Sequence, residues 1–297
     1  MDNPRRFLDP VTIAKISNMS LRAKFVVEGF IAGLHRSPFR GFSVEFSEHR
    51  EYSPGDEIKH IDWRVYGKTD KYYIKQYEEE TNLKCYLILD ASASMGYRSE
   101  GVTKLEYGSY LAASLAYLML KQQDLVGLVT FSDQIESNIP PRGSSAHIQA
   151  LLNILDNLRP SGETNISKIL HDLAQNIKRT GLIILISDLF DDPEGILNGL
   201  KHFRYRKHDV IVFHLLDKYE LTFPFEGLTI FEDLEEDLKV TAYPEAIRKE
   251  YQVSIQNFIR DCRSHCRYSN IDYCQINTSF PLDEALASYL AKRERLF

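Results

Sequence analysis

The chain has 297 residues, of which 43% are hydrophobic and 26% are charged, and its formal net charge is −6. This length suits one large α/β domain with an extension or two modest domains, and the composition is that of an ordinary globular protein. The mild negative charge gives no electrostatic argument for nucleic-acid binding. No apolar run approaches the roughly 18–20 residues of a membrane-spanning helix, and no signal-peptide segment follows the first residues. A cytoplasmic protein without a transmembrane segment is therefore expected.

Residues 1–80 are expected to form an N-terminal helix and a β-rich extension. Residues 21–34 carry apolar side chains at helical spacing, which predicts a helix that docks on the rest of the protein. Residues 42–46 and 71–77 alternate between polar and apolar side chains like half-buried strands, and the Pro and Gly at 52–56 indicate a turn between them.

Residues 81–297 are expected to form the second domain, because strands and helices alternate from residue 83 onward. Near-continuous apolar runs predict parallel strands that helices cover on both faces: 85–89, 125–131, 182–187, 210–216 and 271–276. Residues 134–139 predict an antiparallel edge strand, and residues 221–238 an insertion or an edge hairpin. Helices are expected at 104–121, 146–158, 166–178, 193–203, 244–266 and 282–293. This alternation predicts a doubly wound, mostly parallel sheet of the α/β class.

The first predicted strand of this domain ends in Asp90, which is followed by Ser92 and Ser94. A carboxylate and two hydroxyls at this spacing can place three oxygens on one small, hard cation. Hydroxyl ligands add no negative charge, so a Mg²⁺ or Mn²⁺ ion held in this way retains a strong affinity for a carboxylate from another molecule. The motif predicts a metal-dependent binding site. The alternative is that Asp90 only caps the turn after the strand.

Two further segments provide matching ligands. Thr164 lies in a glycine-containing loop before a predicted helix that Asn165 is expected to cap, and Asp188 ends another apolar strand. Ligands of doubly wound sheets bind at the carboxyl ends of the strands, so Asp90 and Asp188 are expected to converge. Water and a partner group would complete the six ligands of the ion.

These three motifs resemble those of the von Willebrand factor A domain, and they follow that family's order along the chain. The resemblance runs from about residue 83 to the C-terminus. It implies that the two serines and the threonine bind the metal directly and that the carboxylates often act through water. The chain has Leu189 where the family usually has Gly, and Asp191 or Asp192 could therefore take the role of Asp188.

The segments before this region resemble the signature of a bacterial family called domain of unknown function 58. They are residues 49–56, 61–64 and 71–80. The resemblance implies that the protein is an accessory of a MoxR-type AAA+ ATPase in complex assembly or maturation, with a carboxylate-bearing client. Five residues of these segments form either a partner surface or a salt-bridged β-extension: Arg50, Asp56, Asp62, Trp63 and Arg64.

The favoured hypothesis is a non-enzymatic, metal-dependent protein-binding module. No Ser/His/Asp or Cys/His arrangement stands in a motif context, and the chain has no Walker-type phosphate loop. One alternative is a metal-free scaffold protein. The other is a metal-dependent phosphohydrolase, which would need an activated water and a base that the motifs do not provide.

Overall fold

The computed structural model describes residues 10–16, 18–34, 49–51, 73–75, 83–235, 238–283 and 286–287. Met1–Gly33 and Leu83–Phe297 form one compact unit, and Leu34–Asn82 form a second. The helices α1 (Pro10–Ala14) and α2 (Met19–Leu34) therefore group with the α/β part of the chain, although the sequence analysis assigned them to an N-terminal region that ends at residue 80.

In the second unit, β1 (His49–Glu51) and β2 (Tyr73–Lys75) pair in antiparallel fashion, with Arg50 opposite Ile74. The β2 strand lies inside the segment 71–77 that was predicted to be a strand. The strand predicted at 42–46 and the turn at 52–56 lie outside the described residues. The same holds for Asp56, Asp62, Trp63 and Arg64 of the expected partner surface.

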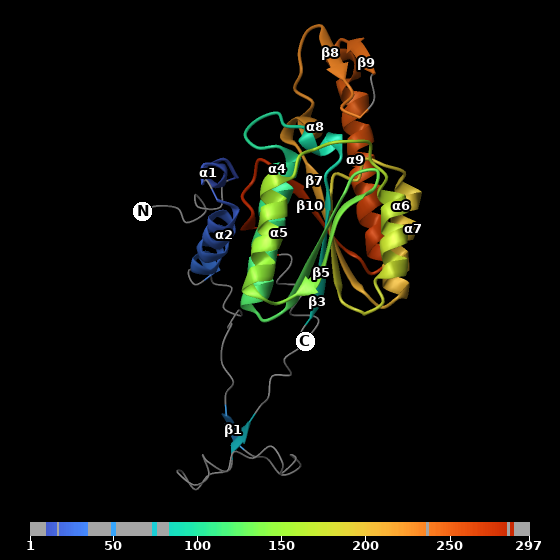
Figure 1. The fold of residues 1–297 in the computed structure, drawn as a ribbon. Coiled ribbons are helices and arrows are strands. Elements are labelled where there is room, and N and C mark those ends of the chain that lie inside the picture. The colour runs from blue at the N-terminus through green and yellow to red at the C-terminus, as the bar shows by residue number, and fades with distance from the viewer. Residues whose placement is uncertain are drawn as a thin grey trace. The chain divides into compact units, whose positions relative to one another are not determined.

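A six-stranded sheet forms the centre of the first unit, with the strand order β10-β7-β6-β3-β4-β5 (Figure 1). Five strands run parallel, and β5 pairs antiparallel with β4 at one edge. Both the doubly wound α/β fold class and the antiparallel edge strand are thereby confirmed. The strands are β3 (Lys84–Asp90), β4 (Leu125–Phe131), β5 (Ile135–Arg142), β6 (Leu182–Ser187), β7 (Asp209–Leu216) and β10 (Asp272–Asn277).

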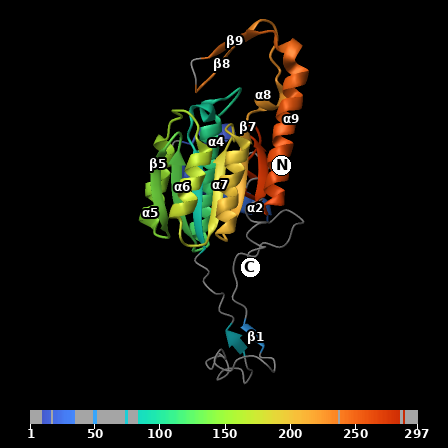
Figure 2. The same cartoon turned by 90° about the vertical axis from the view of Figure 1, so that its right-hand side faces the viewer.

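Helices cover both faces of this sheet. The helices α4 (Lys104–Lys121) and α5 (Ser145–Asn157) lie on one face (Figure 1). The opposite face carries α6 (Ile166–Asn176), α7 (Pro193–Tyr205) and α9 (Pro244–Tyr268), as Figure 2 shows. All six residues of β6 are buried, which explains why the sequence there is apolar without alternation.

Two features of α4 fix it closely against the sheet. A capping box starts the helix, because the Thr103 hydroxyl accepts a bond from the Glu106 amide while the Glu106 carboxylate accepts one from the Thr103 amide. Gly108 faces the strands, and a Cβ there would lie 3.0 Å from the Leu89 side chain. The absence of a side chain therefore lets the helix approach the end of β3.

The predicted docking of the N-terminal helix is confirmed for α2. Its Arg22 guanidinium lies over the ring of Tyr110 on α4, 5.1 Å from the centroid, and forms an ion pair of 3.7 Å with Asp156 on α5. Ala23 and Val26 of the same helix are buried.

Between β7 and α9 the chain forms the short helix α8 (Lys218–Thr222) and an antiparallel hairpin of β8 (Thr229–Glu232) and β9 (Lys239–Ala242). Residues 221–238 were expected to form an insertion or an edge hairpin; the hairpin is an insertion that forms its own two-stranded sheet and does not extend the edge of the central sheet. Of the helix predicted at 282–293, the structure describes residue 282 as a turn and residues 283, 286 and 287 as helical. Within the described part of the chain, no helix combines the length and the apolar character needed to cross a membrane.

The strand order reverses direction between β3 and β6. From β3 the chain moves to β4 and β5 on one side, whereas β6 is followed by β7 and β10 on the other side. The carboxyl ends of β3 and β6 therefore flank the switch point of the sheet, where doubly wound folds bind ligands. Asp90 ends β3, and Asp188 follows the last residue of β6.

The fully buried His214 on β7 should make stability depend on pH. Burial lowers its pKa to about 4, and its Nδ1 atom lies 2.6 Å from the Tyr273 hydroxyl. Between this value and the unfolded value of about 6.5, the unfolded chain binds more protons at this residue. The stability that depends on His214 should therefore be full above about pH 6.5 and decline as the pH falls toward 4.

Chemical unfolding of wild type and His214→Gln across this pH window measures the effect. The variant should lose a slope of up to about 1.4 kcal/mol per pH unit, which is the contribution of one proton. Tyr273→Phe keeps the titrating ring and should keep the slope. An equal slope in wild type and His214→Gln would contradict the assignment.

Candidate functional site

Asp90 organises the end of β3 through both of its carboxylate oxygens. The side chain is completely buried. Its Oδ1 accepts a bond of 2.9 Å from the Ser92 amide, and its Oδ2 accepts one of 2.7 Å from the Ser187 hydroxyl at the end of β6. Asp90 therefore does cap the turn after the strand, as the simpler alternative expected, and it also joins the two strands at the switch point.

The two serines of the first motif place their hydroxyls side by side. Ser92 precedes the 3₁₀ helix η3 (Ala93–Gly96) and makes no side-chain cap to it. The Ser92 and Ser94 Oγ atoms lie 3.1 Å apart. Neighbouring ligands in an octahedral Mg²⁺ shell lie about 3.0 Å apart, given metal–oxygen distances of about 2.1 Å. The two hydroxyls are thus spaced like one edge of such a shell.

Backbone hydrogen bonds tie the loop that carries Thr164 to the first motif. The Ser161 amide donates to the Ala91 carbonyl at 2.9 Å, and the Ala93 amide donates to the Gly162 carbonyl at 3.0 Å. Gly162 has a φ of 74°, which glycine adopts without strain. Asn165 caps α6 by accepting from the Lys168 amide, as predicted. The structure thereby brings the second motif beside the first.

Thr164 is engaged by a carboxylate of its own chain. The Thr164 hydroxyl donates a bond of 2.6 Å to Glu235 Oε1, and its amide donates one of 2.9 Å to Oε2. The Ser94 amide lies 3.4 Å from the same Oε1. Glu235 follows β8, and in Figures 1 and 2 the β8–β9 hairpin extends above the end of the sheet that carries the site.

A buried lysine contacts the carboxylate of the third motif. The Lys104 ammonium lies 2.7 Å from Asp188 Oδ2 and 2.6 Å from Glu220 Oε1, and the side chain is only 1% exposed. The ring of Phe190 lies 5.0 Å from this ammonium. Asp188 Oδ1 accepts a bond from the Phe190 amide at 3.3 Å. Asp188 is therefore already paired with a cation from the protein.

The protonation equilibria reflect these contacts. Burial raises the pKa of Asp90 to about 7, and the nearby Asp188 carboxylate adds to the effect. Burial alone would lower the pKa of Lys104, but the carboxylates of Asp188 and Glu220 more than offset this and raise it above its usual value. Lys104 is thus a permanent cation, whereas the charge of Asp90 is only partly compensated.

The residues that follow Asp188 serve local structure. Asp192 caps α7 by accepting from the amides of Glu194 and Gly195. Asp191 Oδ2 accepts from the Ser167 amide in the first turn of α6 at 3.2 Å. Both carboxylates are thus used in capping, and of the three candidates Asp188 is the one that lies at the switch point.

Three hydroxyls beside carboxylates form a set of oxygen donors of the kind that a small, hard divalent cation would accept. The Lys104 ammonium pairs with the carboxylates of Asp188 and Glu220, and it lines the same cavity as Glu235. Ser94, Thr164 and Glu235 line one cavity of about 470 Å³, so two hydroxyls of the motifs face the same space. Ser92, Ser94 and Thr164 could hold the ion, with Asp90 behind them.

Sequence reasoning missed Lys104, Glu235 and Ser187. Lys104 was expected only to begin a helix. A lysine is unfavourable beside the positive end of a helix dipole, so its presence in the first turn was a signal that it has another role. Glu235 lies in the insertion and is 71 residues from Thr164, so no spacing rule connects them. Ser187 was treated as part of the strand.

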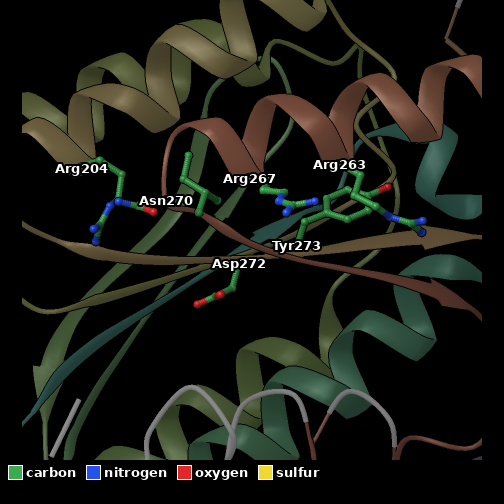
Figure 3. Close-up of a pocket in the computed structure, with 7 residues that line it drawn as sticks. Arg204, Arg263, Arg267, Asn270, Asp272 and Tyr273 are labelled. Carbon is green, nitrogen blue, oxygen red and sulfur yellow. The ribbon is translucent and has the colours of Figure 1, made fainter. Parts of the chain in front are cut away.

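A second cavity of about 400 Å³ lies at Arg204, Arg263, Arg267 and Tyr273 (Figure 3). Arg204 is paired with Asp209 at 2.8 Å, and the Arg263 guanidinium lies 5.8 Å from the centre of the Tyr273 ring. Figure 3 shows the guanidinium groups of Arg204 and Arg263 at opposite ends of the cavity. They do not converge on one point and thus form no evident anion site.

Leu189 occupies the position where glycine is usual and has a left-handed conformation, with a φ of 58° and a buried side chain. A non-glycine residue in this conformation costs about 1–2 kcal/mol. We expect Leu189→Gly to be more stable than Leu189→Ala, which reverses the usual order. Both should be less stable than wild type because a buried side chain is lost.

Urea unfolding of the two variants measures the difference. At Leu87, in the middle of β3, the corresponding Ala and Gly variants should show the usual order, with Gly the less stable. A Leu189→Ala variant that is more stable than Leu189→Gly would contradict the assigned strain.

Comparisons with known proteins place the chain in a family. The family model described as "Protein of unknown function DUF58" matches residues 48–258. An uncharacterized protein of Mycobacterium bovis is 24% identical over 232 residues, which cover 76% of this chain and 72% of the relative.

Solved structures resemble the fold. The conserved hypothetical protein BatB of Bacteroides thetaiotaomicron has a TM-score of 0.50 at 17% identity and covers 72% of this chain and 99% of its own. The VWA domain of SpRpn10 has a TM-score of 0.42 at 13% identity, over 70% of this chain and 94% of its own. The likeness to BatB supports the fold alone. Because the family model matches most of its length, this chain belongs to the family of proteins of unknown function DUF58.

Proposed function

We propose that this chain is a non-enzymatic protein-binding module that holds Mg²⁺ or Mn²⁺ at the switch point of its sheet and captures a partner carboxylate there. The observation that carries the proposal is the spacing of 3.1 Å between the Ser92 and Ser94 hydroxyls, next to carboxylates whose charge one lysine only partly balances. Ser92, Ser94 and Thr164 would hold the ion, and Asp90 and Asp188 would support it.

When bound, the metal would supply positive charge and an open position for a carboxylate. The protein residues prepare this position. Asp90 fixes the Ser92 backbone, and Lys104 holds Asp188 in place. Thr164 directs its hydroxyl and amide toward the Glu235 carboxylate, which marks where a partner carboxylate would lie. The Ser92 and Ser94 hydroxyls lie within hydrogen-bond distance of each other, at 3.1 Å.

The family resemblance suggests the partners of this module. We propose a MoxR-type AAA+ ATPase, with a client protein that supplies an Asp or Glu side chain to the site. The segment around Arg50, which forms β1, is a second candidate contact for the ATPase.

One observation favours a second candidate, a metal-free scaffold. The Lys104 ammonium already pairs with Asp188 at 2.7 Å and so provides a cation at the third motif without a metal. In that case Lys104 would stabilise the buried carboxylates, and the contacts with partners would be made by the surface of the module.

Titration of Mg²⁺ and Mn²⁺ into metal-stripped protein by calorimetry separates the two candidates. Wild type should bind one ion, and Ser92→Ala and Thr164→Ala should each weaken binding about tenfold or more, because each removes a ligand of a small ligand set. Thr222→Ala, at an exposed position at the end of α8, should bind like wild type.

The same titration can also contradict the proposed metal site. If folded wild type showed no saturable binding, or if Ser92→Ala and Thr164→Ala bound as wild type does, the metal site would be rejected and the scaffold would be favoured.

The partner proposal predicts that the MoxR-type ATPase of the same genome, or its client, copurifies with the wild-type protein. Capture should decrease strongly in EDTA and in Thr164→Ala, since both disturb the position for the carboxylate. Thr222→Ala should capture the same proteins as wild type. Equal capture under all these conditions would contradict a metal-dependent interaction.

A further inference from the structure

We infer that Glu235 is an internal ligand of this site, which a partner carboxylate must displace before it can bind. The inference rests on the proposed function, because it concerns the regulation of the same site. It adds that the free protein occupies its own binding position with a carboxylate from the β8–β9 hairpin.

The contacts of Glu235 are those of a bound carboxylate. Each of its two oxygens accepts a bond from a different donor of Thr164: Oε1 from the hydroxyl at 2.6 Å and Oε2 from the amide at 2.9 Å. The Ser94 amide approaches Oε1 at 3.4 Å. Donors from two motifs of the metal site thus converge on one side chain. A carboxylate is also the group that a metal ion held mainly by hydroxyls is expected to bind.

The turn of the hairpin presents Glu235 to the site. The Asp233 carboxylate accepts a bond of 2.7 Å from the Glu235 amide, and the Asp233 amide donates one of 2.9 Å to the Leu238 carbonyl. These bonds fix the backbone at the residue that carries the carboxylate. The hydrogen bonds of the side chain, in contrast, are made to the site and not to the hairpin.

Little apolar surface holds the hairpin in this place. Leu234 and Leu238, on either side of Glu235, are 51% and 53% exposed. On the inner side, Phe231 stacks on Phe223 with a centroid distance of 5.5 Å. The Gly227 amide, at the base of the hairpin, donates to Glu245. Withdrawal of the Glu235 side chain would therefore break polar contacts that a partner carboxylate can replace, and the protein core would stay intact.

Electrostatics also favour exchange. Glu235 shares its cavity with Glu220 and with Lys104, whose ammonium is already paired with Glu220 and Asp188. Like charges weaken its hold on the site in the absence of a metal. A divalent ion would favour carboxylate binding in general, so Glu235 and a partner side chain would compete for the same position.

Hydrogen exchange of individual amides, measured by NMR, tests the inference on the whole chain. In Glu235→Ala the amides of Thr164 and Ser94 lose their acceptor, and Thr164 should exchange roughly tenfold faster than in wild type. The matched control is Glu232→Ala, on the same hairpin, whose carboxylate pairs with Lys239 at 2.8 Å on the surface. This control should leave both amides unchanged.

Acetate, with Mg²⁺ present, then serves as the minimal carboxylate probe, and acetamide as its uncharged counterpart. Acetate should restore slow exchange of Thr164 in Glu235→Ala at concentrations that do not affect wild type, and acetamide should not. Glu235→Asp, whose side chain is one methylene shorter, provides a second variant with the charge retained if Glu235→Ala proves poorly folded by circular dichroism.

Three results would overturn the inference. The first is unchanged exchange of Thr164 in Glu235→Ala. The second is equal protection by acetate in wild type and variant, which would leave the proposed carboxylate site in place without an internal competitor. The third is faster exchange that acetate does not reverse. Glu235 would then only stabilise the local structure, and the result would count against the proposed function as well.

Discussion

The site depends on one buried carboxylate at the point where the sheet changes direction. Asp90 receives the Ser92 amide on one oxygen and the Ser187 hydroxyl on the other, so it fixes both the loop after β3 and the end of β6. Buried polar groups need such partners, and here the partners also position the ligands. The paired serine hydroxyls, and the loop of Thr164 that is bonded to Ala91 and Ala93, follow from this arrangement.

Two charged side chains from outside the motifs, Lys104 and Glu235, contact residues of the site. Lys104 enters from the start of α4 and pairs with Asp188, which stabilises a carboxylate that would otherwise be buried without a counterion. Glu235 enters from the hairpin and occupies the donors of Thr164. The free protein therefore already places a cation, Lys104, at the third motif and an anion, Glu235, at the second. A metal and a partner carboxylate would act on a site that is already occupied in part.

Much of the fold was predictable from the sequence because it depends on local patterns. Apolar runs such as 182–187 indicate buried parallel strands, and the polar interruptions of 134–139 indicate an edge. Asp90, Ser92 and Ser94 were predictable together because they lie within five residues at the end of a strand. Lys104 and Glu235 were not, because their roles arise from contacts between segments 84 and 71 residues apart. The placement of α2 with the α/β unit likewise depends on tertiary contacts.

The central claim is that the hydroxyls of Ser92, Ser94 and Thr164 surround a divalent cation. Anomalous diffraction from crystals grown with Mn²⁺ tests this most directly, because it locates the metal without reference to a model of the site. The account predicts one anomalous peak within coordination distance of these three hydroxyls. A well-ordered site with no peak there, and with Lys104 still paired to Asp188 as the local cation, would contradict it.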